Sequence, residues 1–400
     1  MSATLLIVLS LLASQLAPKS PPAPAPAASR PKAPAPSSKA FDDLSRRAQE
    51  AHAAQKLDEA LALYEKALEM RPGWTEGRFG LGTVLYDLDR HRDARTAFRR
   101  VAAEQPESGP AWAFKGMCEF QLKNYEQALA DLQKGRLLGL GGNANMKTVV
   151  DFHAAILLTR FEHYEVAREI LRDFALGDKD SPGVIEALGL AGLRLPYVPG
   201  EAPAEKREMI LIAGRALFHF TRNRYSPAAR FAFEELVTRY PEEPGAHYAY
   251  GAFLMTLNEV ESGLAEFRRV LAIQPTHVPA MLQIALNLLK QGDFSQALPY
   301  AEKAALTEPD FFAAHNALGR IQLELGRTDE AIEHLEKAAR LAPNSAQTFF
   351  ALARAYQRAG RTEDVRKARE KFMELDAAMR AELMRGQTQD LPLDPVSPKE

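Results

Sequence analysis

Cysteine is almost absent from this chain. Its 400 residues include one, Cys118, which can form neither an internal disulfide nor a thiolate zinc site by itself. Because Cys118 lies within a helical pattern, we expect it to act as a small buried hydrophobic side chain.

An excess of charge of one sign is lacking as well. The chain has 50 Lys and Arg against 52 Asp and Glu, a formal net charge of −2. No overall field therefore attracts the protein to nucleic acid, and no basic stripe alternates with aromatic residues. We predict that nucleic acid is not a partner.

Motifs for catalysis, cofactors and metals are missing. The sequence has no phosphate-binding loop and no G-x-S-x-G elbow, and the glycines between Gly77 and Gly82 follow no strand. None of the nine histidines forms a pair with metal-ligand spacing, so a metal site could arise only by convergence in space. No two carboxylates stand out as an acid–base pair. We predict no catalytic, cofactor or metal site, and hence no enzyme.

Long hydrophobic runs are also lacking. The apolar run at the N-terminus, Leu5–Ala13, is too short to span a bilayer and has the length of a secretory signal core. We expect 1–17 to be a signal peptide or short N-terminal anchor, and the protein to be exported to the bacterial periplasm or cell envelope. An uncleaved anchor in the inner membrane and a misassigned start codon are the alternatives.

Residues 18–40 form a linker rich in Pro and Ala. They contain four basic residues and no acid, and proline at this density gives an extended spacer. The segment is either a basic tether beside a membrane or cell wall, or a solvated linker whose charges have no partner.

The rest of the chain repeats with a period of 34 residues. Small residues carry one series: Ala60, Ala94 and Ala128, then Ala229, Gly263, Ala297 and Ala331. A second series of small residues has the same period: Ala48, Gly82 and Gly116, then Gly251, Ala285, Gly319 and Ala353. Prolines repeat in step at positions 72 and 106, then 241, 275, 309 and 343. A period of this length indicates a solenoid of stacked units.

Each unit has the pattern of two amphipathic helices joined by a turn. In 313–341, apolar residues recur at three- and four-residue spacing on both sides of Gly326. Gly319 and Ala331 are small where two helices would cross closely, and Gly326 suits a left-handed residue after the first helix. We expect Thr328 to cap the second helix and Pro343 to follow its end.

This pattern resembles the tetratricopeptide repeat family. Trp112, Gly116, Ala128 and Leu132 match the family's register in 109–142, as do the small residues and prolines of the other units. The resemblance implies an all-α fold, a right-handed superhelical solenoid of stacked helix–turn–helix repeats interrupted near the middle. It departs from the family at 109–142, which lacks the final proline, and at Val365 and Arg369, as expected of a solvent-facing terminal repeat.

The resemblance gives a division of the chain. We predict an N-terminal array at 41–142, a C-terminal array at 210–379, and a helix end with a polar tail at 380–400. The segment between the arrays, 143–209, combines a degenerate repeat with the apolar helix 183–195. That helix is either packed between arrays or a hinge or docking element for a partner.

The resemblance also implies how the protein works. First-helix positions two, five, nine, twelve and thirteen would line a concave groove that binds a protein or peptide. The predicted groove residues are Phe79, Thr83, Met117, Phe218, Tyr248, Asn316, Arg320, Gln347, Arg354 and Arg358. The first five suggest an apolar stretch, and the last five a polar, basic patch for a carboxylate or acidic peptide.

Two functions follow from these expectations. The first is a protein-binding scaffold or adaptor in the periplasm or cell envelope. The second is an accessory subunit of an exported enzyme or secretion machine, docked through 183–195. Membrane contact is expected only through the possible N-terminal anchor, and the sequence does not give the oligomeric state.

Overall fold

A computed structural model describes residues 39–177 and 180–384 of the chain. The described residues form α-helices joined by short turns, with one 3₁₀ turn at Ala204–Lys206 and no strand. None of these helices combines the length and the apolar character that crossing a bilayer requires. The predicted signal at 1–17 and nearly all of the linker at 18–40 lie outside the described residues. The all-α prediction is confirmed.

The helices form two compact units, which divide between Ile170 and Leu171. The helices of the first unit are α2 (Lys39–Ala53), α3 (Leu57–Met70), α4 (Thr75–Asp87), α5 (His91–Glu104), α6 (Gly109–Gln121), α7 (Tyr125–Leu138) and α8 (Ala144–Arg160). The division falls within α9 (Tyr164–Leu176). The predicted degenerate repeat in this region corresponds to α8 and α9, on which the small and apolar residues Ala155, Ala167 and Leu171 are buried.

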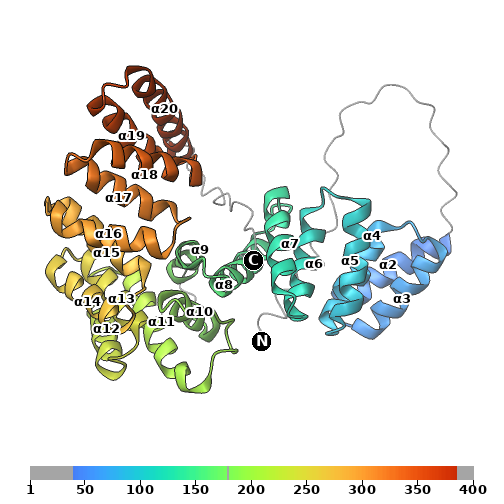
Figure 1. Ribbon diagram of the computed structural model, residues 1–400. Helices are drawn as coiled ribbons and strands as arrows, with labels where there is room; N and C mark the ends of the chain where they lie inside the picture. The colour runs from blue at the N-terminus through green and yellow to red at the C-terminus, as the bar shows by residue number, and fades with distance from the viewer. Residues whose placement is uncertain (1–38, 178–179, 385–400) are drawn as a thin grey trace. The chain divides into compact units, whose positions relative to one another are not determined.

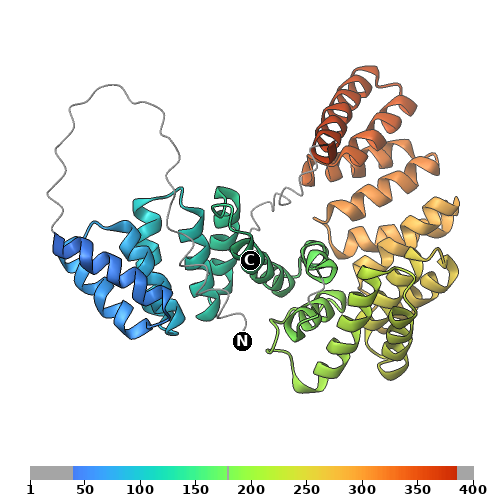
Figure 2. The same cartoon turned by 180° about the vertical axis from the view of Figure 1, so that it is seen from behind.

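The second unit contains the longer array. Its helices are α10 (Pro182–Gly192), α11 (Arg207–Arg222), α12 (Pro227–Arg239), α13 (Pro244–Thr256), α14 (Val260–Ile273), α15 (Val278–Gln291), α16 (Phe294–Thr307), α17 (Phe312–Glu324), α18 (Thr328–Leu341), α19 (Ala346–Arg358) and α20 (Thr362–Met384). Figure 1 shows α13 to α20 stacked as successive antiparallel hairpins, and Figure 2 shows the same order from behind.

The 34-residue period corresponds to the packing of each hairpin. In α17 and α18, a side chain at Gly319 would place its Cβ 2.7 Å from Leu335 Cγ and 2.9 Å from the Ala331 carbonyl oxygen. Only glycine permits this approach without displacement of the neighbours. The alanines of the series are fully buried for the same reason, among them Ala60, Ala94 and Ala297. The period therefore marks where paired helices touch.

The turn between α17 and α18 confirms one expectation and corrects another. Gly326 has φ +79°, the left-handed conformation expected after the first helix. Thr328 is not the cap: the helix already begins at Thr328, so the cap position falls on Arg327, which makes no side-chain cap hydrogen bond. The acidic Asp329 and Glu330 still lie in the first turn, where they favour the positive end of the helix dipole.

The apolar helix predicted at 183–195 is α10, and it belongs to the interior of the second unit. Its apolar side chains, from Val184 to Leu193, are buried. The helix crosses α11 through two glycines, because a Cβ on Gly189 would lie 1.9 Å from the Ile210 carbonyl oxygen and one on Gly214 the same distance from that of Ile185. This supports the interpretation that the apolar helix is packed inside the fold. A partner that docks on α10 would find no exposed apolar face there.

The last repeat has the expected solvent-facing end. Val365 is half-buried and Arg369 is exposed on α20. At 23 residues, α20 is longer than the 14-residue second helices α14, α16 and α18, and it exposes Met373 and Met379.

Candidate functional site: a basic cluster on α17 and α19

The predicted apolar stretch of the groove is mostly buried. Thr83, Met117, Phe218 and Tyr248 are no more than 7% exposed, and Phe79 is half-buried. Their contacts explain this: the ring of Phe79 meets Phe98 and Phe114, and the Tyr248 ring meets Phe267 and His277. These side chains join neighbouring helices, so a partner would reach them only after the packing opened.

Asn316 also lies in the interior, although it was predicted to line the groove. It is 5% exposed, and its Nδ2 donates a hydrogen bond of 2.7 Å to Thr348 Oγ1. The Thr348 hydroxyl in turn donates to Ser345 Oγ at 2.9 Å. Because Asn316 is on α17 and Thr348 is on α19, this chain of bonds fixes the spacing of two successive first helices.

Three of the remaining predicted residues, Arg320, Arg354 and Arg358, form an accessible basic cluster. Arg354 Nη2 lies 2.8 Å from Glu324 Oε1, and Arg358 Nη2 lies 3.4 Å from Glu324 Oε2. Arg358 also donates to the backbone carbonyl of Leu323. The two arginine side chains are 45% and 41% exposed, so both remain open to an incoming anion.

Arg320 lies one turn before Glu324 on α17 and makes no hydrogen bond or ion pair within the described residues. It is half-buried. Burial lowers the pKa of its guanidinium, the positive charge of Arg354 lowers it further, and Glu324 opposes both effects. Two guanidinium groups thus pair with the Glu324 carboxylate and a third lies within its field, and burial beside Arg354 makes Arg320 favour an added negative charge.

Gln347 is exposed near the start of α19, on the same face by the repeat register. The structure therefore brings Arg320, Arg354 and Arg358 together in the second unit, and places Gln347 on the helix that carries two of them. The predicted groove residues that are buried, among them Met117, Tyr248 and Asn316, are not part of this surface.

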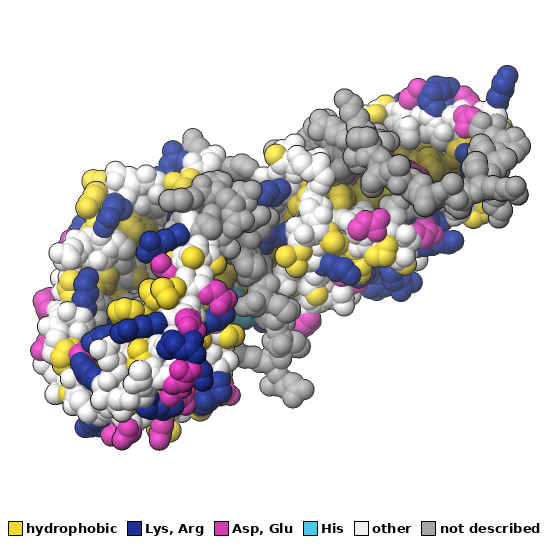
Figure 3. Space-filling view, turned by 90° about the horizontal axis from the view of Figure 1, so that it is seen from above, with side chains coloured by type: hydrophobic (Ala, Val, Ile, Leu, Met, Phe, Trp, Pro, Cys, Tyr) yellow, Lys and Arg dark blue, Asp and Glu magenta, His cyan; other side chains and the backbone are white. Residues whose placement is uncertain are grey.

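Two residues of this surface were missed from the sequence. Glu324 precedes Arg358 by one 34-residue period, and Leu286 precedes Arg320 by the same interval. Leu286 is 36% exposed on α15, so one apolar side chain lies in register with the basic cluster. Figure 3 shows one face of the molecule on which Lys and Arg side chains lie among hydrophobic ones. Extending the repeat register to all first helices would have found both residues.

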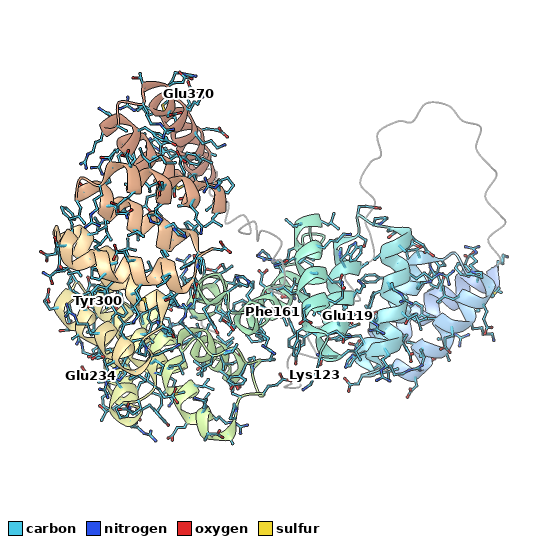
Figure 4. All side chains as sticks on the ribbon, in the orientation of Figure 1. Glu119, Lys123, Phe161, Glu234, Tyr300 and Glu370 are labelled. Atoms are coloured by element: carbon cyan, nitrogen blue, oxygen red, sulfur yellow. The ribbon has the colours of Figure 1, made fainter. Side chains whose placement is uncertain are left out.

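In the first unit the charge of one buried carboxylate, that of Glu119, is balanced by its neighbours. Glu119 on α6, labelled in Figure 4, is buried and accepts from Arg95 at 3.2 Å and from Asn124 at 2.7 Å. The adjacent Cys118 is fully buried, as expected, and burial raises the pKa of its thiol. This thiol is therefore unreactive at neutral pH.

Comparison with known families identifies the repeats. One model of the tetratricopeptide repeat matches residues 214–278 and 282–346, and another matches residues 51–118. These matches fall in both compact units, and the first includes all of α17 and α18.

Among curated proteins, the chain matches the probable biofilm formation methyltransferase WspC of Pseudomonas putida. The two are 29% identical over 80 residues, which is 20% of this chain and 19% of that protein. The chain thus spans about a fifth of the length of this relative.

Solved structures of MamA align with parts of the chain. One, a double mutant of MamA RS-1, is 22% identical with a TM-score of 0.40 and covers 44% of this chain and 97% of its own. Another, MamA residues 41 to the end from Desulfovibrio magneticus, is 24% identical with a TM-score of 0.37 and covers 45% and 97%. A third, MamA AMB-1, is 26% identical with a TM-score of 0.36 and covers 42% and 98%.

The family matches, the 34-residue period and the stacked antiparallel hairpins agree with one another. This chain belongs to the tetratricopeptide repeat family.

Proposed function

We propose that the protein is a binding scaffold whose second unit holds an acidic segment of a partner protein. The observation that carries the proposal is the cluster of Arg320, Arg354 and Arg358 around the single carboxylate of Glu324. Tetratricopeptide arrays present such a surface preorganised, because each first helix is fixed by its neighbours. The protein acts by binding, without chemistry of its own.

The chemistry of the surface specifies the segment. A carboxylate beside Arg320 gains a charge-assisted hydrogen bond in a half-buried place, where charge pairs are stronger than in water. A second carboxylate reaches Arg354 or Arg358, and an apolar side chain contacts Leu286 on α15. The partner segment therefore alternates acidic and apolar residues.

We propose further that the scaffold works outside the cytoplasm, in the periplasm or cell envelope, or from an inner-membrane anchor. This part rests on the sequence of residues 1–40 alone. Fractionation of cells that express the full chain tests it. Recovery from the periplasm or envelope, lost when residues 1–17 are deleted, supports export, and recovery of both forms from the cytoplasm overturns it.

Binding is tested with defined peptides and the full chain. Fluorescence anisotropy measures the affinity for a labelled peptide of alternating Leu and Glu, and for its counterpart of Leu and Gln. We expect the Glu peptide to bind more tightly, with an affinity that falls as salt is added, since the contact is largely electrostatic. The double variant Arg320→Glu, Arg354→Glu should weaken it by at least tenfold, roughly 1.4 kcal/mol.

The matched control changes the same charge on second helices. Arg268 on α14 and Arg340 on α18 are exposed and take part in no ion pair within the described residues. The variant Arg268→Glu, Arg340→Glu should bind the Glu peptide nearly as wild type does, apart from a small effect of net charge. Equal losses in the two double variants would show that net charge, and not this surface, attracts the peptide.

A further inference from the structure

The fourth position of several repeats carries a hydrogen-bond donor. In each case its side chain donates to the backbone carbonyl of the proline six residues earlier, which links the start of one repeat to the end of the preceding one. The pairs are Arg78 to Pro72, Trp112 to Pro106 at 2.9 Å, His247 to Pro241 at 3.0 Å and His315 to Pro309 at 2.7 Å. Where the donor is histidine, Nε2 makes this bond, and Nδ1 remains for another partner.

The partner of Nδ1 differs between the two histidine repeats. His247 Nδ1 lies 2.6 Å from Glu266 Oε2 on α14. His315 Nδ1 lies 3.0 Å from His334 Nδ1 on α18, in the equivalent place nineteen residues later. In the first repeat the Glu266 carboxylate accepts a hydrogen bond from His247 Nδ1, whereas in the second two imidazole nitrogens face each other.

The proton positions follow from these bonds. A neutral His315 carries its proton on Nε2, because that atom donates to the Pro309 carbonyl, so its Nδ1 has a free electron pair. His334 then donates its own Nδ1 proton to that electron pair at 3.0 Å. The two ring planes are inclined by only 18°, with centroids 5.2 Å apart. The rings therefore face each other edge to edge, with the two Nδ1 atoms on the facing edges.

We propose that His315 and His334 bind a transition-metal cation of the Zn²⁺ class between their Nδ1 atoms. Two Zn–N bonds of about 2.0–2.1 Å at a tetrahedral angle place the nitrogens about 3.3 Å apart. The pair has to open by a few tenths of an ångström, and each ring has to turn so that its Nδ1 electron pair points at the ion. His315 already has the supporting bond that metal-binding histidines use, from the other ring nitrogen to a backbone carbonyl.

Loading the site requires no net loss of a proton at neutral pH. The His334 proton moves from Nδ1 to Nε2, and His334 is half-buried, so water can reach this ring. Asp310, Glu330 and Glu333 lie close enough to favour a cation, and Lys337 opposes it. Within 39–177 and 180–384 no three His, Cys, Asp or Glu side chains converge, so water or an incoming ligand completes the coordination.

Isothermal titration of the full chain with Zn²⁺ tests the site. We expect wild type to bind one equivalent more than His334→Gln or His315→Gln, with at least a tenfold loss of affinity for that equivalent in each variant. His247→Gln, which alters the same position in another repeat, should retain it. Circular dichroism shows whether each variant is folded.

Bound Co²⁺ gives a second readout that a structural role of the pair would not produce. Its visible absorption should change when it binds wild type, and this change should be absent in His334→Gln. Saturating Zn²⁺ should also raise the melting temperature of wild type more than that of His334→Gln. Identical Zn²⁺ isotherms and Co²⁺ spectra for wild type and both variants would overturn the proposal.

Discussion

Glu324 on α17 pairs with Arg354 on α19 at 2.8 Å, and so joins two successive repeats on the face that the first helices share. It also lies 3.4 Å from Arg358. The carboxylate therefore holds two guanidinium groups in place and at the same time competes with any anionic ligand for them.

Replacing Glu324 by Gln should tighten binding of the acidic peptide. The variant removes the competing negative charge, and we expect a gain of about threefold to tenfold, roughly 0.7–1.4 kcal/mol. Anisotropy titrations measure it at low and physiological salt, and the gain should shrink as salt increases. Because the two arginines are nearly half exposed, the free energy of unfolding should change by less than about 1 kcal/mol. Weaker binding in the variant would mean that orienting the arginines outweighs the competition.

Asn316 should affect stability and leave the groove chemistry unchanged. Asn316→Ala removes the 2.7 Å bond to Thr348 within a buried place, and we expect the free energy of unfolding to fall by about 1–3 kcal/mol. Urea titrations monitored by circular dichroism measure the change. Gln347→Ala, at an exposed position on α19, is the matched polar control and should change it by less than about 0.5 kcal/mol. An equal effect of both substitutions would contradict the interior role of Asn316.

Much of this fold could be predicted from the sequence, because the positions that repeat are those where backbones touch. Gly319 and Ala331 could be placed at a helix crossing, since a Cβ at Gly319 would meet the neighbouring helix and Ala331 is fully buried. Gly326 could be assigned a left-handed conformation for a similar reason. Local sterics decide both features, so a periodic pattern reveals them.

The candidate site could be predicted only in part. The register placed Arg320, Arg354 and Arg358 on one face, but it did not show that Asn316 and Met117 are covered by adjacent helices. Burial at a given register position depends on the sizes of side chains from neighbouring repeats. The facing of His315 and His334 likewise depends on two rotamers, which the spacing of residues along the chain does not determine.

Replacing Gly189, where α10 crosses α11, by any larger residue should destabilise the protein. In Gly189→Ala the new Cβ would lie 1.9 Å from the Ile210 carbonyl oxygen, so the helices must move apart. We expect the free energy of unfolding to fall by about 1–3 kcal/mol, as for overpacked cores. Gly73→Ala is the control, because nothing lies within 4 Å of the added Cβ, and it should be nearly neutral. Urea unfolding measures both variants, and similar midpoints would argue against close contact of these helices.

The two histidine repeats should respond to pH in opposite directions. Burial lowers the pKa of His315 and of His334 below 6.5, and each is lowered further by a neighbouring positive or imidazole group. Their folded forms therefore favour the neutral ring, and the stability they contribute is present above pH 6.5 and is lost as pH falls toward their folded pKa values. Burial alone would lower the pKa of His247, but Glu266 and the Pro241 carbonyl raise it above 6.5. Its contribution is present below pH 6.5 and is lost as pH rises through the folded pKa.

Single variants separate the two effects. His334→Gln should reduce the loss of stability that wild type shows between about pH 6.5 and 5, because one of the two rings that must become charged is gone. His247→Gln should reduce the loss of stability that wild type shows as pH rises above 6.5. The variant has no charged pair with Glu266 at low or at high pH, so it has no such stabilisation to lose. The free energies of unfolding of wild type and both variants, taken from urea titrations across this range, measure the differences. Parallel pH profiles for all three proteins would mean that neither ring changes its protonation on folding.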